Sequence, residues 1–121
     1  MPSKHNPVVY LHEILEGIER IQGYVGGLSF DVYERLLEKQ DAVERRLSIV
    51  TEAADRFQQV EKDFSPNTNW RAIHSLGNVL RHEYDSIDLQ TIWDIIHRDL
   101  PALQAAVEAI LRDHFPGAPP R

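Results

Sequence analysis

The chain has 121 residues, a length that fits one domain with a hydrophobic core of its own. Its 19 acidic and 13 basic residues give a formal net charge of −6. This charge opposes nonspecific binding to nucleic acid, so nucleic-acid binding would require a local basic patch. The absence of cysteine excludes disulfides and thiolate chemistry. No apolar run reaches the roughly 18 residues of a membrane-spanning helix, and the polar N-terminus has no signal-peptide core, so we expect a cytoplasmic protein without membrane contact.

The first half of the chain predicts three helices after a flexible polar arm at residues 1–6. Asn6 suits an N-cap, and apolar residues then recur at spacings of three and four up to residue 25, where a Gly-Gly pair ends the pattern. Ser29 predicts the next N-cap, and residues 30–37 can form a short helix that bends away from a long one. The inner face of the long helix is marked by Val43, Leu47, Val50, Ala54, Phe57 and Phe64.

The second half predicts further helices after the break at residues 65–69, Ser-Pro-Asn-Thr-Asn. Asp88 suits the N-cap of the last helical region, in which Pro101 predicts a kink or a break near residues 99–100. The Pro-rich tail at residues 115–121 cannot continue a helix. No stretch alternates with period two, so the sequence predicts an all-α fold, an up-and-down bundle of four or five helices over residues 7–114. The buried side of the helix after the break is expected to carry Trp70, Ile73, Leu76, Leu80 and Ile87.

One stretch of that helix, residues 76–84, concentrates the polar chemistry of the chain. Asn78 and His82 are four residues apart and therefore share a helix face, on which His74 lies one turn earlier. Tyr84 projects about 200° around the helix axis from His82. Gly77 lies in the helix interior, where glycine costs about 1 kcal/mol relative to alanine, and close approach of another helix or of a ligand would justify it.

His82 can take or give a proton at cellular pH, and RNA carries its own nucleophile in the 2′-hydroxyl. With Asn78 as a hydrogen-bonding group, metal-independent RNA cleavage is therefore possible in principle, although such a His–Asn pair is more often an ordinary polar contact. A metal site is not expected. His74 and His82 are about 12 Å apart along the axis, and no zinc-binding spacing occurs in the chain.

Several short motifs occur together over most of the chain: Gln40-Asp41-Ala42-Val43, Thr51-Glu52-Ala53-Ala54, Trp70-Arg71, Gly77-Asn78-Val79-Leu80-Arg81-His82-Glu83-Tyr84, Ile92-Trp93 and Asp99-Leu100-Pro101. As a set they resemble the HepT-like toxins of the HEPN superfamily, over about residues 7–112. The resemblance implies a small helical bundle that forms a homodimer, and a partner, a minimal nucleotidyltransferase antitoxin. It also implies RNase activity that needs no cofactor, carried by an Arg-x4–6-His motif near the dimer interface.

The resemblance assigns roles to three residues of the polar stretch. His82 matches the motif histidine, and Asn78 matches the polar residue that commonly follows the motif arginine. Tyr84 matches the tyrosine that the antitoxin modifies with AMP, which would place bulk and negative charge beside the site and repel RNA. The implied function is a toxin of a type VII-like toxin–antitoxin pair.

The chain departs from this pattern where the motif arginine would fall, at Gly77. Arg71 and Arg81 are the candidates for binding a phosphate in its place, although Arg71 lies about 16 Å from His82 along the axis and would have to act across a dimer. Three hypotheses follow: an RNase toxin, a catalytically weak or inactive protein of this fold that pairs with a nucleotidyltransferase, and a structural bundle whose polar stripe is a dimer seam.

Overall fold

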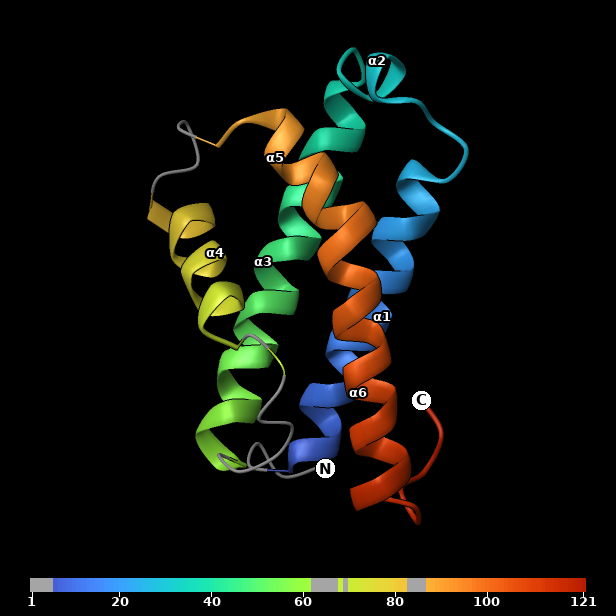
Figure 1. Cartoon of the computed structure of the whole chain (residues 1–121), viewed down its shortest axis with the longest axis vertical. Helices are drawn as coiled ribbons and strands as arrows, with labels where there is room; N and C mark the ends of the chain where they lie inside the picture. The colour runs from blue at the N-terminus through green and yellow to red at the C-terminus, as the bar shows by residue number, and fades with distance from the viewer. Residues whose placement is uncertain (1–5, 62–67, 69, 83–86) are drawn as a thin grey trace.

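The computed structural model describes residues 6–61, 68, 70–82 and 87–121, and all regular structure in these residues is helical (Figure 1). The bundle runs up and down: α1 and α4 point one way along the long axis, and α3 and α6 point the other way. This arrangement confirms the predicted all-α bundle. The helices are α1 (Pro7–Val25), α2 (Phe30–Tyr33), α3 (Leu37–Val60), α4 (Trp70–His82), α5 (Leu89–Asp94), the π-helix η2 (Ile95–Asp99) and α6 (Leu100–His114). None of the described helices is both long and apolar enough to cross a membrane.

α3 is the central helix of the bundle. It packs against α1 on one side and against α4 on the other, while α6 packs against α1 (Figure 1). The apolar faces predicted from periodicity form one continuous core, because side chains spaced by three and four residues lie on one side of a helix. The most deeply buried of these side chains include Leu11, Ile14, Ile18 and Ile21 of α1, Val43, Leu47, Val50 and Phe57 of α3, and Ile92 and Val107.

Two predicted helix starts are confirmed by their capping hydrogen bonds. The Asn6 side chain accepts a bond from the backbone N–H of Val8 at 3.0 Å, and the Ser29 hydroxyl accepts one from Val32 at 3.2 Å. Asp88 occupies the N-cap position of α5, but its carboxylate accepts a bond from the Thr91 hydroxyl at 3.4 Å and bonds no backbone N–H.

Two residues that were predicted on helix faces, Phe64 and Ile87, lie outside the helices that the structure describes. α3 ends at Val60, since Glu61 has left the helical region with φ −135° and ψ 82°. Phe64, which was expected on the inner face of this helix, lies outside the described residues. The structure describes α4 as far as His82, and Ile87, which was expected on its buried side, is not helical but still packs against the core.

The interruption expected before Pro101 takes the form of a π-helical turn. The backbone N–H of Leu100 bonds the carbonyl of Ile95, five residues back, at the end of η2. Proline has no N–H and its ring crowds the carbonyl four residues earlier, so the wider turn removes the conflict while the chain remains helical. Pro101 then lies in the first turn of α6, where proline is tolerated.

At Gly77, α4 approaches α3 too closely for a side chain. This glycine is buried, and a Cβ atom at this position would lie 2.8 Å from Thr51 Oγ1 and 2.9 Å from Thr51 Cβ. Thr51 is itself 1% exposed, and its hydroxyl donates to the carbonyl of Ser48 at 3.0 Å. Of the two reasons that could justify this glycine, the structure therefore supports helix approach, and the two helices belong to the same chain.

We predict that Gly77→Ala destabilises the protein by about 1–3 kcal/mol, because the new methyl group overlaps Thr51 and neither helix can move without disturbing the core. The better helix propensity of alanine, worth about 1 kcal/mol, offsets only part of this loss. Gly23→Ala is the matched control: nothing lies within 4 Å of its Cβ position, so this change should stabilise by about 0.5–1 kcal/mol. Urea unfolding of both variants measures the difference, and equal effects would contradict the close-approach explanation.

Tyr33 carries a buried hydroxyl that has no hydrogen-bond partner in the part of the chain that the structure describes. Its ring packs against Trp93, with ring centroids 5.1 Å apart. Burial, with a smaller contribution from the charge of Glu44, raises the pKa of Tyr33 from 10.0 to about 12.

We predict that Tyr33→Phe leaves stability near pH 7 unchanged or raises it by about 1 kcal/mol, because it removes an unsatisfied polar group. Because the folded-state pKa of Tyr33 is raised, the unfolded state releases this proton first, so the fold loses stability from this group as the pH rises from 10 towards 12. The free energy of unfolding of the wild type should therefore fall relative to the variant across this interval. Parallel curves for the two proteins from pH 9 to 12 would contradict the prediction.

Candidate active site

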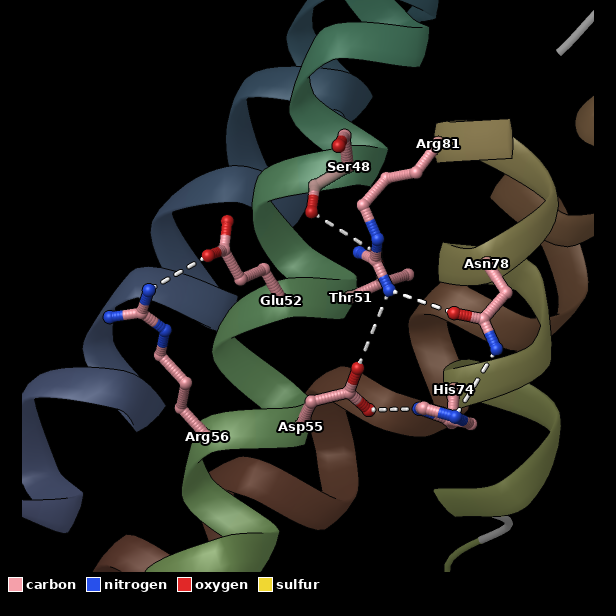
Figure 2. A network of polar contacts seen from close by, with 8 residues as sticks. All are labelled: Ser48, Thr51, Glu52, Asp55, Arg56, His74, Asn78 and Arg81. Atoms are coloured by element: carbon pink, nitrogen blue, oxygen red, sulfur yellow. Dashed lines mark hydrogen bonds and ion pairs between the residues drawn. The ribbon is translucent and has the colours of Figure 1, made fainter. Parts of the chain in front are cut away.

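Four polar side chains form a closed ring where α3 and α4 meet (Figure 2). On α4, His74, Asn78 and Arg81 lie at spacings of four and three and therefore share a face, and Asp55 faces them from α3. One Asp55 oxygen, Oδ1, lies 3.0 Å from His74 Nδ1, and the other, Oδ2, lies 3.7 Å from Arg81 Nη2. Asn78 closes the ring: its Oδ1 accepts from Arg81 Nη2 at 3.2 Å, and its Nδ2 lies 3.3 Å from His74 Nε2.

Arg81 reaches this ring by folding back along α4 over Gly77. Its Nη1 lies 3.2 Å from the place that a Cβ at residue 77 would take, on the same side as Thr51. The absence of a side chain at Gly77 thus makes room both for α3 and for the guanidinium. The chain lacks an arginine at residue 77, but Arg81 places a guanidinium directly above that position.

The structure groups only some of the residues predicted for the site. Asn78 and Arg81 are brought together in the ring. His82 is the exposed last residue of α4, and Arg71 is exposed near its other end; neither bonds another described side chain. Tyr84 lies outside the described residues.

Sequence reasoning missed Asp55 and gave His74 no role. One signal was available: Thr51 and Asp55 are four residues apart on α3, at the same spacing as Asn78 and His74 on α4. Recognising the match would have required knowing that these two faces pack together in antiparallel orientation, which the sequence does not state.

The ring borders two open depressions, which meet at Asp55 and Gln59. The larger, of about 560 Å³, extends between α1 and α3 and is bordered by Arg81; the smaller, of about 370 Å³, is bordered by His74. Volumes of this order can admit a nucleotide-sized ligand. Within the described residues, no group of three or more His, Cys, Asp or Glu side chains is arranged to hold a metal ion. The larger depression is lined by Tyr10, Glu52, Asp55, Arg56, Gln59, Val60 and Arg81.

The comparison with known families matches residues 14–110 to the family described as Ribonuclease HepT-like. The chain belongs to the HepT-like ribonuclease family. This membership confirms the resemblance drawn from the sequence motifs. No solved structure matches the chain significantly.

Relatives of this HepT-like chain carry ribonuclease names. "Probable ribonuclease HepT" of Thermococcus cleftensis is 29% identical over 84% of this chain and 92% of its own length. "Putative RNase MJ0127" of Methanocaldococcus jannaschii is 28% identical over 93% of both chains. The chain spans about half, 47%, of another relative from that organism, "Gamma-glutamylcyclotransferase and putative RNase MJ0434", with 28% identity over 87% of this chain.

Proposed function

We propose that this HepT-like chain is the toxin of a toxin–antitoxin pair and acts as a metal-independent endoribonuclease. The observation that carries the proposal is the placement of the Arg81 guanidinium on the polar face of α4, oriented by Asn78 and adjacent in sequence to His82. In the reaction, the 2′-oxygen of RNA attacks the neighbouring phosphorus and the bond to the 5′-oxygen breaks. One proton must leave the 2′-hydroxyl and another must reach the 5′-oxygen.

Arg81 suits the phosphate-binding role for two reasons. Its planar fork of N–H donors matches the geometry of phosphate oxygens, and charge-assisted hydrogen bonds of this kind stabilise the charge that develops at the phosphate. Its side chain is 32% exposed and borders the larger depression, so RNA can reach it. Because the whole chain carries a net charge of −6, such a local cation is what makes RNA binding favourable.

His82 is proposed as a proton-transfer residue, since its exposed ring follows Arg81 directly and histidine is the side chain that most often acts as a general acid or base. Asn78 is proposed to act beside it by orienting Arg81 through the 3.2 Å hydrogen bond. Arg71, about 16 Å from His82 along the helix axis, could contribute to RNA binding only from the second subunit of a homodimer.

A specific observation favours a second function, that of a catalytically weak protein of this fold that binds a nucleotidyltransferase. Asp55 Oδ2 lies 3.7 Å from Arg81 Nη2, so a carboxylate partly neutralises the cation on which phosphate binding depends. Together with glycine at residue 77, this contact would weaken RNA cleavage while leaving the scaffold able to bind a partner.

We further propose that the chain forms a cytoplasmic homodimer and that a minimal nucleotidyltransferase antitoxin silences it by adding AMP to Tyr84. The support for this regulation is family membership and the position of Tyr84 two residues after His82. An adenylate there adds a phosphate charge, which would repel the RNA backbone.

We predict that purified wild-type protein cuts labelled RNA in the presence of a chelator, and that His82→Ala lowers the cleavage rate by about 10²–10⁴-fold. Arg81→Ala should also abolish most cleavage, and Arg81→Lys should restore little of it, because an ammonium lacks the planar fork. Arg20→Ala is the control, since it removes an exposed guanidinium on α1 that interacts with Glu16 and Tyr24, outside the ring. Undiminished cleavage by His82→Ala would reject the assignment, and no cleavage by the wild type would favour the second function.

We predict that incubation with ATP and the nucleotidyltransferase encoded beside it adds AMP to Tyr84, as detected by mass spectrometry of the peptide that contains it. Tyr84→Phe should stay unmodified. Tyr10 and Tyr33 are buried and should not react in the folded protein. Adenylate on another tyrosine only, or on none, would remove Tyr84 from the proposal.

A further inference from the structure

The hydrogen-bond ring at the α3–α4 contact determines where its protons lie. An arginine side chain can only donate, so the Asn78 atom that faces Arg81 must be the amide oxygen. The Asn78 atom that faces His74 is then the NH₂ group, which also only donates. His74 Nε2 must therefore accept and carries a lone pair, which places the ring proton on Nδ1, where it is donated to Asp55 at 3.0 Å.

This proton arrangement is that of a histidine prepared to act as a base. The carboxylate of Asp55 holds the imidazole in the Nδ1–H tautomer and stabilises the imidazolium that forms when Nε2 takes a proton. The Asp55 side chain is 18% exposed, which keeps it in place, while the His74 side chain is 53% exposed and open to a ligand. The charged groups that face His74 in the described structure are Asp55 from α3 and, beyond Asn78, Arg81 on the same helix.

His74 also lies close to the proposed phosphate position. A single amide group, that of Asn78, separates Arg81 Nη2 from His74 Nε2, with contacts of 3.2 and 3.3 Å on its two sides. Of the guanidinium nitrogens, Nη2 is the one that faces the Asn78 oxygen. A phosphate that binds Arg81 through Nη2 displaces this oxygen, and Asn78 is then free to turn away from Nε2. Figure 2 shows Asn78 between Arg81 and His74, so substrate binding in this mode would uncover the basic nitrogen.

We propose that His74, oriented by Asp55, is the general base of RNA cleavage. Its Nε2 takes the proton of the 2′-hydroxyl as the 2′-oxygen forms its bond to phosphorus. The bond from phosphorus to the 5′-oxygen breaks, His82 in its imidazolium form protonates that oxygen, and the products are a 2′,3′-cyclic phosphate and a 5′-hydroxyl. His74 lies one turn before Asn78 and His82 one turn after it, and the proposal places base and acid on opposite sides of the phosphate. This inference rests on the proposed ribonuclease function and names the second proton-transfer residue of that site.

The test is the pH dependence of kcat/KM for RNA cleavage in chelator. The wild type should give a bell-shaped profile, with a rising limb from the base and a falling limb from the acid. His74→Gln is expected to lower kcat/KM by about 10²–10⁴-fold and to remove the rising limb.

Asp55→Asn is expected to move the rising limb to lower pH, because the charge that stabilises the imidazolium is lost. This variant should lower kcat without weakening the binding of a non-cleavable 2′-deoxy oligonucleotide, since the change removes a carboxylate beside Arg81.

Matched controls separate this role from a structural one. His97→Gln and Asp94→Asn change an exposed histidine and an exposed aspartate far along the chain from the ring, and both should keep the wild-type profile. Thermal unfolding identifies any variant that fails to fold. If His74→Gln fails to fold, the pH profile of Asp55→Asn tests the proposal in its place.

The outcomes distinguish this inference from the function on which it rests. If His82→Ala abolishes cleavage while His74→Gln keeps the rising limb and the rate, the ribonuclease stands and the role of His74 is overturned. If the wild type cuts no RNA, both are overturned. Nitrogen-15 NMR provides a separate check, because a His74 with its proton on Nε2 in the wild type would also overturn the inference.

Discussion

The contact between Gly77 and Thr51 sets the distance between α3 and α4, and the polar site depends on that distance. With no side chain at residue 77, the helices approach until the Thr51 side chain occupies the space that a Cβ would need. At this separation Asp55 of α3 reaches both His74 and Arg81 of α4. A larger residue would push α4 outwards and separate the carboxylate from its partners, since α4 has its main packing contact with α3 alone.

The same glycine links the architecture to the chemistry. The family pattern places an arginine at this position, but here an arginine side chain would start in space already taken by Thr51 and by the guanidinium of Arg81. Arg81, one helical turn later, folds back and places its guanidinium there. In the ring, each of the side chains Asp55, His74, Asn78 and Arg81 has polar partners within the protein. If RNA binds as proposed, a phosphate at Arg81 Nη2 displaces the Asn78 oxygen, and substrate binding then rearranges the ring.

Local rules accounted for most of the fold. The helix faces on α1 and α3 and the caps at Asn6 and Ser29 followed from spacing and from hydrogen bonds within one turn, which depend little on the rest of the protein. At the end of α3 the backbone leaves the helix after Val60, before the predicted apolar position Phe64, because a periodic apolar pattern does not fix where a helix ends. At Pro101 the sequence predicted an interruption, and the packing of the surrounding helix gave it the form of a π-turn.

The sequence by itself determined the all-α class, the membership in the HepT-like family and the shared helix face of His74, Asn78 and His82, because these follow from motifs and from residue spacing along one helix. Only the tertiary structure decided that Asp55 belongs to the site and that Arg81, not Arg71, joins Asn78. The physical reason is that the partner of His74 lies on another helix, 19 residues away in the chain. Which residues meet across two helices depends on the distance between the helices and on the register in which they pack. Here the distance depends on the contact between Gly77 and Thr51, which the local sequence pattern does not reveal.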